Sequence, residues 1–366
     1  MADSKVKTIG IVGAGQLGRM LALAGYRLGL KFLFLDKSKD APGGQIGDII
    51  LGEFSDPAKV AELASKVDLL TYDVENVPVE ALARVPKDKP FLPPVKALAV
   101  GQDRLSEKTL FNELKIPTTK YRAVQTMADM EEAIHAIGYP AVLKTRRLGY
   151  DGRGQRVIRS PAELGSAFNA LCGVPLILEE FIAFEREVSL IGVRNTQGET
   201  AFYPLAENTH REGILRLSIA PYPDKKLQAA AQKHMKKLLD KFDYAGVLTI
   251  EFFVRKGKLV ANETAPRVHN SGHWTIEGAV TGQFENHMRA ILGLPLGETW
   301  AVGYSAMVNF IGTMPTREEV LAIPGAHYHD YGKEPRPGRK LGHATVVCKT
   351  RKDLLNRLKK FPGLDA

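Results

Sequence analysis

Tyr139-Pro-Ala-Val-Leu-Lys144 is followed, four residues later, by Gly149-Tyr150-Asp151-Gly152-Arg153-Gly154-Gln155. The first segment is apolar and predicts a buried strand that ends in a lysine. The second contains three glycines. Glycines carry no Cβ, so successive backbone N–H groups can close on an anion while nearby arginines supply positive charge. We expect this loop to fold over a polyphosphate; a flexible basic surface loop is the alternative.

The composition is that of an ordinary globular protein. The chain has 366 residues, 44% of them hydrophobic and 25% charged, a length that predicts two or three domains. No apolar run reaches the roughly 20 residues that cross a bilayer. Met1 to Lys7 is short and polar, so we expect no signal peptide. Cys172 and Cys348 lie far apart, as in reduced thiols. We expect a cytoplasmic protein without a membrane partner.

The net charge of +9 calls for an anionic partner or reflects a solvated basic surface. The basic residues are dispersed, apart from dense segments at 336–340 and 349–360. No basic stripe with interleaved aromatic residues stands out, so we expect no nucleic-acid partner. Small phosphorylated substrates explain the charge at least as well.

The N-terminal third has a β-α-β pattern. We expect a strand at 8–13, a helix from 15 to about 28 and a strand at 31–35. Gly13-x-Gly15-x-x-Gly18, with Asp36 18 positions after the last glycine, matches a dinucleotide-binding fingerprint. An NAD-dependent oxidoreductase is therefore one alternative. A helix at 57–65 and a strand at 67–72 follow. Glu75 comes just after that strand, where open parallel sheets place ligand-binding groups.

The remaining pattern is mixed α and β. A proline-rich connector at 86–94 and a helix at 104–114 precede the glycine loop. Residues 175–182 predict a strand that turns into a hinge, and 187–193 another strand. The basic amphipathic stretch at 227–242 predicts a helix packed on a sheet rather than on a membrane.

Two strands at 246–254 and 259–263 predict a hairpin, and its register decides whether Glu251 and Glu263 share a face. A two-residue loop would pair Glu251 with Asn262. A three-residue loop, with a positive φ at Gly257, would pair Glu251 with Glu263. Opposed carboxylates in an apolar sheet repel unless a cation lies between them. Their oxygens suit Mg²⁺ bridging nucleotide phosphates, although a solvated sheet face is the alternative.

Two polar loops carry candidate substrate-binding groups. The first runs through Thr264-Ala-Pro-Arg267-Val-His269-Asn270-Ser271-Gly272-His273-Trp274 and directly follows the second strand of the hairpin. Loops that leave a strand in this way usually hold substrate. The second runs through Gly332-Lys333-Glu-Pro-Arg336-Pro-Gly338-Arg339-Lys340-Leu-Gly342-His343. Its cations suit a phosphate monoester, and a basic turn is the alternative.

Four motifs in chain order resemble those of one family. They are Gly-Gln-Leu-Gly at 15–18, Gly-Tyr-Asp-Gly-Arg-Gly-Gln at 149–155, Arg-x-His-Asn-Ser-Gly-His-Trp at 267–274 and Gly-Arg-Lys-x-Gly-His at 338–343. Over nearly its whole length, the chain resembles the ATP-grasp superfamily and, within it, the N5-carboxyaminoimidazole ribonucleotide synthetases. The resemblance implies a ligase of purine biosynthesis. It would carboxylate 5-aminoimidazole ribonucleotide through carboxyphosphate, with ATP, Mg²⁺ and bicarbonate.

The resemblance also implies an α/β ATP-grasp fold in four parts. A doubly wound, Rossmann-like domain would span 1–102, a small α+β lid domain 103–183 and a catalytic domain 184–300. A small β-rich segment at 301–366 would bind the substrate phosphate. A homodimer is implied as well, and a mutase is the expected next enzyme of the pathway, with physical contact left open.

The family pattern implies a role for each matching residue. Arg104 and Lys144 would contact ATP phosphates beneath a lid formed by 149–155. The hinge at Glu179, Glu180, Phe181 and Ile182 would read adenine, with Glu187 on the ribose and His210 nearby. Glu251 and Glu263 would hold Mg²⁺ beside Asn262. The ribonucleotide would contact the side chains of Gln16, Leu17, Glu75, Arg267, His269, Asn270 and Ser271, and its phosphate those of Lys333, Arg339 and Lys340. Catalytic roles would fall to Arg153, His269, Lys340 and Glu75, with the choice of His269 or Glu75 for the amine proton left open.

Two positions depart from the family pattern, since Val268 stands where proline is common and Asp73 where a longer carboxylate is usual. The formate-dependent glycinamide ribonucleotide transformylase is a sister alternative, which has an acidic residue at the position of Asn270. A biotin-dependent carboxylase would be longer than this chain. A non-catalytic nucleotide- or RNA-binding protein is the third class of alternative.

Overall fold

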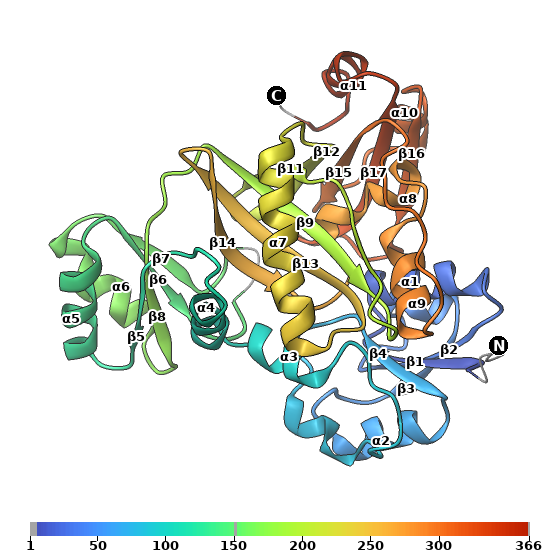
Figure 1. Cartoon of the computed structure of the whole chain (residues 1–366), viewed down its shortest axis with the longest axis horizontal. Helices are drawn as coiled ribbons and strands as arrows, with labels where there is room; N and C mark the ends of the chain where they lie inside the picture. Colours follow the sequence, from blue (N-terminus) through green and yellow to red (C-terminus); the bar gives the residue numbers. More distant parts are fainter. Residues whose placement is uncertain (1–5, 150–151, 365–366) are drawn as a thin grey trace.

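The computed structural model describes residues 6–149 and 152–364, so Tyr150 and Asp151 of the predicted lid loop lie outside the described residues. The described residues form three sheets, each covered by helices (Figure 1). This arrangement confirms the mixed α/β class that the sequence predicts.

The N-terminal sheet has four parallel strands in the order β3-β2-β1-β4. Its predicted strands are confirmed within a few residues, as β1 (Thr8–Val12), β2 (Lys31–Asp36) and β4 (Leu69–Tyr72). The predicted helices are α1 (Gln16–Tyr26) and α2 (Pro57–Ser65). The strand β3 (Asp48–Leu51) was not predicted, because four residues are too few to show alternation. The 3₁₀ helix η2 (Val79–Arg84) precedes the predicted connector at 86–94, which leads to α3 (Val95–Gly101).

A smaller antiparallel sheet has the order β5-β8-β6-β7. It consists of β5 (Tyr121–Val124), β6 (Ala141–Thr145), β7 (Gln155–Ile158) and β8 (Leu176–Glu180). The helices α5 (Met127–Ile137) and α6 (Leu164–Leu171) share a hydrophobic core with it. The helix α4 (Arg104–Glu113) lies between this sheet and the large one (Figure 1).

The large sheet has the order β14-β13-β9-β11-β12-β15-β17-β16, with β10 also paired to β9. Its strands are β9 (Arg186–Arg194), β10 (Thr200–Phe202), β11 (Ala206–Arg211), β12 (Ile214–Ala220), β13 (Gly246–Arg255), β14 (Lys258–Ala265), β15 (Tyr304–Ile311), β16 (Ala326–Asp330) and β17 (Lys340–Cys348). The C-terminal strands extend this sheet through the pairing of β12 with β15, rather than forming a sheet of their own.

Helices cover both faces of the large sheet. The basic amphipathic helix α7 (Lys225–Phe242) packs its apolar side on the sheet, as predicted. Leu190 belongs to the core beneath α7, whereas the next residue, Ile191, belongs to the core beneath α9 (Gln283–Ile291). Because neighbouring residues of a strand point to opposite faces, α7 and α9 lie on opposite sides of β9. The short helices are η1 (Pro42–Gln45), η3 (Pro161–Glu163), η4 (Asn270–Gly272), α8 (Thr275–Gly278) and α10 (Arg317–Leu321), and the last helix is α11 (Arg351–Leu358).

Within the described residues, none of the helices combines the length and the apolar character needed to cross a bilayer.

Candidate active site

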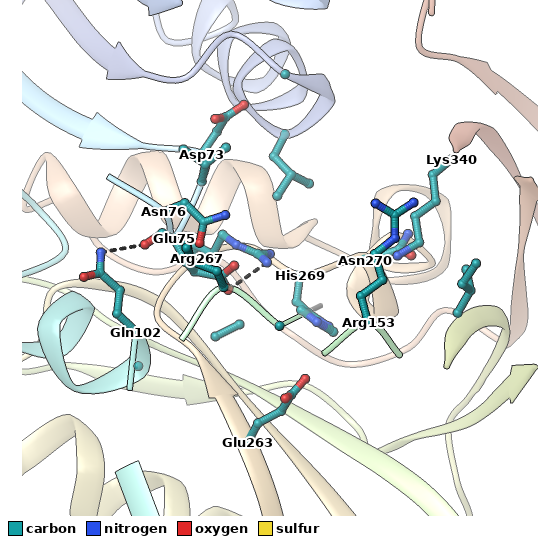
Figure 2. A pocket seen from close by; sticks show the side chains of 18 of the residues that line it. Asp73, Glu75, Asn76, Gln102, Arg153, Glu263, Arg267, His269, Asn270 and Lys340 are labelled. Carbon is teal, nitrogen blue, oxygen red and sulfur yellow. Dashed lines mark hydrogen bonds and ion pairs between the residues drawn. The ribbon is translucent and has the colours of Figure 1, made fainter. Parts of the chain in front are cut away.

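A polar cavity of about 730 Å³ is lined by segments from all parts of the chain (Figure 2). Of the residues predicted for the site, it brings together Gln16, Leu17, Glu75, Arg104, Gly149, Arg153, Glu251, Glu263, Arg267, His269, Asn270, Lys333, Arg339 and Lys340. Twelve other predicted residues are described but do not line it. They are Lys144, Gly152, Gly154, Gln155, Glu179, Glu180, Phe181, Ile182, Glu187, His210, Asn262 and Ser271. The cavity therefore holds the predicted acceptor and metal groups, and most of the predicted nucleotide groups lie outside it.

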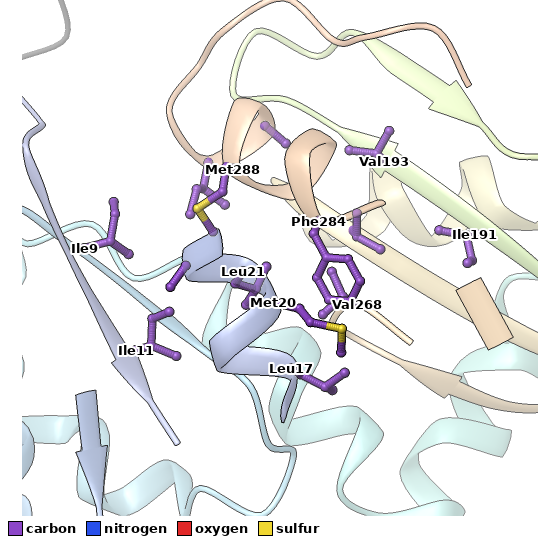
Figure 3. Close-up of a cluster of buried hydrophobic side chains, with 14 of the residues drawn as sticks. Ile9, Ile11, Leu17, Met20, Leu21, Ile191, Val193, Val268, Phe284 and Met288 are labelled. Carbon is purple, nitrogen blue, oxygen red and sulfur yellow. The ribbon is translucent and has the colours of Figure 1, made fainter. Parts of the chain in front are cut away.

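The start of α1 is held in the cavity wall by apolar packing against another domain. Figure 3 shows Leu17, Met20 and Leu21 of α1 in a cluster with Phe284 and Met288 of α9. These side chains are all buried. Packing of this kind fixes the helix start relative to the large sheet, and Gln16 begins that helix.

The glycine fingerprint encloses a carboxylate of the protein itself. Asp73, just after β4, accepts a hydrogen bond from the Gly18 N–H at 3.0 Å. A Cβ on Gly13 would lie 1.7 Å from an oxygen of Asp73. Burial raises the pKa of Asp73 to about 6. Asp36, the acidic residue of the fingerprint, accepts from the backbone N–H groups of Ala14 and Ser38, at 2.9 and 3.0 Å. The space where a dinucleotide pyrophosphate would sit is filled, which removes the basis of the oxidoreductase alternative.

Of the two registers that the sequence left open, the carboxylate hairpin has the one that opposes Glu251 and Glu263, but not through the three-residue loop expected for it. Arg255 pairs with Lys258 across a two-residue turn, whereas Glu251 pairs with Glu263. The register shifts by one residue after Glu251, so β14 carries a bulge at Asn262. A bulge places two residues opposite one and re-aims the side chains beyond it. The bulge, rather than a three-residue loop, brings the two glutamates together.

The two glutamates differ in their electrostatic surroundings. Burial, and then the charge of Glu263, raises the pKa of Glu251 to about 7. Burial acts on Glu263 too, but an ion pair of 3.0 Å with Arg104 holds the pKa of Glu263 below its ordinary value. The buried amide oxygen of Asn262 has no hydrogen-bond partner among the described residues.

This donor set fits a divalent cation that is shared with a nucleotide. The described residues contain no group of three or more His, Cys, Asp or Glu side chains that could hold a metal. A cation here would therefore take two carboxylates from the protein and its remaining oxygens from phosphates and water. Mg²⁺ in nucleotide sites is usually held in this way.

The side chain of Glu179 faces inward, so it does not present itself at the predicted adenine hinge. It is only 2% exposed and forms ion pairs with Lys144 at 3.2 Å and Lys108 at 3.3 Å. Burial lowers the pKa of Lys144, and the charge of Glu179 offsets part of that effect. A contact from this hinge to a base would have to come from the backbone or from its other residues.

The other hinge and ribose residues are divided between two sheets, with Glu180 at the end of β8 in the smaller sheet and Glu187 and His210 on β9 and β11 of the large one. Glu180 pairs with Arg255 at 2.9 Å, Phe181 is 40% exposed and Ile182 is buried. His210 contacts Glu187 at 2.7 Å. Burial lowers the pKa of His210, but the hydrogen bond to Glu187 and the charges of Glu251, Glu187 and Glu263 together outweigh that effect and leave the pKa above its ordinary value.

On the acceptor side of the cavity, Arg267 forms an ion pair of 2.7 Å with Glu75. The backbone carbonyl of Glu75 also accepts from the Gln102 amide at 2.7 Å (Figure 2). Asn270 and Asn309 exchange two hydrogen bonds, of 3.0 and 2.7 Å. This reciprocal pair fixes which way the Asn270 amide points, because each group donates once and accepts once.

The hydrogen bonds of His269 assign its tautomer. Its Nδ1 accepts from the Ser271 N–H at 3.3 Å and lies 2.8 Å from the Ser271 hydroxyl. That hydroxyl accepts from Ser189, so its own proton points to Nδ1. The neutral ring then carries its proton on Nε2, which lies 3.6 Å from a Glu251 oxygen. Burial, and then the charge of Arg267, holds the pKa of His269 well below its ordinary value.

Four cations of the C-terminal loop, Lys333, Arg336, Arg339 and Lys340, line the same cavity. Lys333 is hydrogen-bonded to Gln16 of α1, so this loop contacts the N-terminal domain. Burial, and then the charge of Arg339, lowers the pKa of Lys333 to about 8. This cluster of positive charge suits a phosphate group.

Several polar residues around the site, most of them buried, were missed by sequence reasoning. They are Glu107 and Lys108 of α4, Gln102, and Asn309 of β15. Glu107 and Lys108 stand three and four residues after Arg104, and residues at that spacing share one face of a helix. The sequence therefore held a signal for these two. Asn309 carried no such signal, because only the tertiary fold brings β15 beside the start of η4, where Asn270 lies.

Three family models match the chain and together span most of it. They are the ribonucleotide synthetase preATP-grasp domain at residues 6–102, the ATP-grasp domain at 109–284 and the phosphoribosylaminoimidazole carboxylase C-terminal domain at 305–357. The boundaries predicted from the sequence lie near these ranges, although the family models do not test them.

Named relatives match over nearly their whole length. The N5-carboxyaminoimidazole ribonucleotide synthase of Pseudomonas aeruginosa is 51% identical, covering 97% of this chain and 99% of the relative. The crystal structure of the synthetase from Thermus thermophilus is 53% identical, with a TM-score of 0.92 and coverage of 96% and 97%. A structure from Aspergillus clavatus, in complex with ADP and 5-aminoimidazole ribonucleotide, is 30% identical, with a TM-score of 0.91 and coverage of 97% of each chain. The chain therefore belongs to the ATP-grasp superfamily and, within it, to the family of N5-carboxyaminoimidazole ribonucleotide synthases.

Proposed function

We propose that the protein carboxylates 5-aminoimidazole ribonucleotide, using ATP and bicarbonate, to give N5-carboxyaminoimidazole ribonucleotide, ADP and phosphate. One observation carries the proposal. The carboxylate pair of the hairpin, the Asn270 loop and the C-terminal cation cluster line a single cavity. A site that holds a metal-bound phosphate near an acceptor amine needs these three parts together. The family membership supports the same reaction.

The reaction would proceed in two steps. A bicarbonate oxygen attacks the γ-phosphorus of ATP, the bond to ADP breaks, and carboxyphosphate forms. The substrate amine then attacks the carboxyl carbon, either of carboxyphosphate or of CO₂ released from it, and phosphate leaves. Lys144 and Arg153 would neutralise negative charge on the transferred group, as positioned cations do in phosphoryl transfer.

Glu251 and Glu263 would hold Mg²⁺, with the Asn262 amide oxygen beside them. When bound, the ion supplies positive charge to the β- and γ-phosphates. The chain's own contribution is to aim these oxygens. Arg104 pairs with Glu263, which orients that carboxylate, and would contact an ATP phosphate beside it.

The substrate would lie with its phosphate on Lys333, Arg339 and Lys340 and its amine near Asn270. The glycine loop at 149–155 would close over the nucleotide, because carboxyphosphate hydrolyses in water and needs an enclosed site. Asn309 holds the Asn270 amide in place. An acidic residue at 270, as in the sister transformylase, would lose the donor to Asn309, so this pair favours the aminoimidazole substrate.

Of the two candidates for the amine proton, the tautomer of His269 favours Glu75. Nε2 of His269 already carries a proton, so it can donate but not accept there. Glu75 lines the same cavity, and its carboxylate is oriented by Arg267. Loss of a general base costs on the order of a hundredfold in rate. We expect Glu75→Gln to lower kcat by about that factor and His269→Gln by only about tenfold, with the KM for the ribonucleotide measured for each. A larger loss in His269→Gln would reverse the assignment.

A homodimer, which the family resemblance implies, and a cytoplasmic location, which the composition and the cysteines imply, stay predictions. Light scattering of the purified protein across a concentration series would measure the first. A pull-down with the pathway mutase would test for physical contact between successive enzymes.

The decisive assay is phosphate release from ATP with Mg²⁺ and bicarbonate, with and without 5-aminoimidazole ribonucleotide. We expect strong stimulation by that ribonucleotide and none by glycinamide ribonucleotide with formate. Stimulation by the second pair alone would identify the sister transformylase activity. A protein that binds MgADP but responds to neither acceptor would refute the proposed substrate.

A further inference from the structure

Lys108 is a buried lysine of α4 that the proposed reaction does not use. Its side chain is 1% exposed. Its ammonium donates to Thr118 Oγ1 at 3.1 Å and to the Asn262 carbonyl at 2.9 Å, and lies 3.3 Å from Glu179. A lysine ammonium has three donors, so each has one acceptor. A buried charge is tolerated only when it is paired and hydrogen-bonded in this way.

One acceptor of Lys108 belongs to the bulge of β14. The bulge takes Asn262 out of regular pairing with β13, so its backbone groups need other partners. Lys108 satisfies the Asn262 carbonyl, and Thr118 donates to the carbonyl of Ala261 at 2.8 Å. The N–H of Ala261 donates to the Pro117 carbonyl at 2.7 Å. Lys108 and the segment 117–118 therefore hold the bulge from one side.

The same face of α4 holds the next two residues of β14. Arg104 pairs with the Glu263 carboxylate at 3.0 Å. Glu107 accepts from both the N–H and the hydroxyl of Thr264, each at 2.6 Å. One helical face thus contacts three successive residues, of which the central one is a candidate metal ligand. The bulge decides only which face of the sheet Glu263 lies on. Where its carboxylate points on that face depends on these contacts with α4.

The third acceptor of Lys108 connects it to Lys144. Glu179 lies between the two ammonium groups, at 3.3 Å from Lys108 and 3.2 Å from Lys144. Two positive charges share one carboxylate, so the three groups carry a net charge of about +1. Lys144 is the more exposed of the two lysines. Without Lys108, Glu179 would be left to neutralise Lys144 alone.

We propose that Lys108 is a positioning residue of the nucleotide site. It fixes the β14 bulge that aims Glu263, and by sharing Glu179 it keeps the positive charge of Lys144 available to a nucleotide phosphate. Lys108 itself is buried and contacts neither substrate. The inference rests on the proposed function in one respect, since it takes the nucleotide to bind between Lys144 and the carboxylate pair.

The test compares Lys108→Met with Lys233→Met, a control that removes an exposed lysine of α7. Calorimetry measures the affinity for MgADP and, separately, for 5-aminoimidazole ribonucleotide. Partners that orient metal or phosphate ligands typically change affinity by roughly 10- to 100-fold. We expect Lys108→Met to weaken MgADP binding by at least about tenfold, with the ribonucleotide affinity within twofold of the parent and the control unchanged. In turnover, the KM for ATP should rise while the KM for the ribonucleotide stays constant.

A folded Lys108→Met protein with parental MgADP affinity would overturn the inference, and so would equal weakening of both ligands. Thr118→Val serves if Lys108→Met does not fold, because it removes one partner of Lys108 and leaves every charge in place. It should weaken MgADP binding by about threefold, and an unchanged affinity would again count against the inference. If the parent protein binds MgADP but shows no turnover with the ribonucleotide, the proposed function fails while the calorimetric test of Lys108 still decides.

Discussion

The two glycine-rich segments of this chain have similar compositions and different surroundings. The first, around Gly13, closes on the carboxylate of Asp73. The second, at 149–155, includes Gly149 and Arg153 in the wall of a cavity. Both segments suit a close approach of the backbone to a negative group. In the first segment that group is a carboxylate of the protein itself. In the second we propose that it belongs to a nucleotide.

The difference shows that a glycine pattern predicts close approach of a group without saying which group approaches. The first segment matches a dinucleotide fingerprint in spacing and in its following strand. Only Asp73, more than 50 residues later in the chain, shows that the space is occupied. Substitutions in the first segment should therefore affect stability most, and those in the second should affect activity most.

The largest expected effect is that of Gly13→Ala. The φ of Gly13 is +98°, and a Cβ there would lie 1.7 Å from an Asp73 oxygen. Backbone strain and overpacking together predict a loss of about 4 kcal/mol in the free energy of unfolding. Gly29→Ala is the matched control, because its φ is +76° and its Cβ would meet nothing within 4 Å. Urea unfolding measures the loss of unfolding free energy in both variants. Equal losses would show that the Asp73 side chain moves away from the added Cβ at little cost.

The second effect is the pH dependence contributed by Asp73. Its pKa is raised from 3.8 to about 6 by burial. Between those values the folded state binds more protons than the unfolded state, so stability falls as the pH rises. The fall amounts to about 2.4 kcal/mol between pH 4 and pH 7. Asp73→Asn lacks this titrating group. The free energy of unfolding of the variant should therefore rise relative to that of the parent as the pH increases over this range. Parallel stability curves for the two proteins would refute this account of Asp73.

The smallest stability effect, and the clearest effect on activity, is expected for Gly154→Ala. Its φ is +69°, and a Cβ would lie 2.7 Å from the Thr145 hydroxyl. We expect a loss of only about 1 kcal/mol in stability and about tenfold in kcat/KM for ATP, equivalent to roughly 1.4 kcal/mol. Gly198→Ala is the control, since Gly198 also has a positive φ but lies outside the glycine loop, in the turn between β9 and β10. If Gly198→Ala lost as much activity, the loss could not be assigned to the second glycine segment, and the contrast between the two segments would be wrong.

The carboxylate hairpin illustrates how far the sequence could predict the site. The opposition of Glu251 and Glu263 was one of two registers that the sequence left open, while the two strands and the turn between them followed from alternation and turn residues. The bulge at Asn262 did not, because nothing local in β14 requires it. It is held by Lys108 of α4 and by residues 117–118, which are remote in sequence.

Glu179 and His269 show the other limit of sequence reasoning. Glu179 was predicted to lie at a nucleotide hinge. Its strand, β8, lies within the range that the sequence predicts. Its side chain turns inward because two buried lysines attract it there. The tautomer of His269 depends on Ser189 and Ser271, and no motif states which nitrogen carries a proton.

By itself, the sequence determined the α/β class, most helices and strands, the family, and the residue types that line the cavity. Those properties follow from local periodicity and from motifs of fixed spacing. Tertiary structure alone decided that Asp73 fills the first glycine segment, that a bulge aligns the carboxylate pair, and that Lys108 shares Glu179 with Lys144. Each of these depends on packing between segments far apart in the chain, where burial and charge, rather than sequence spacing, fix the partner.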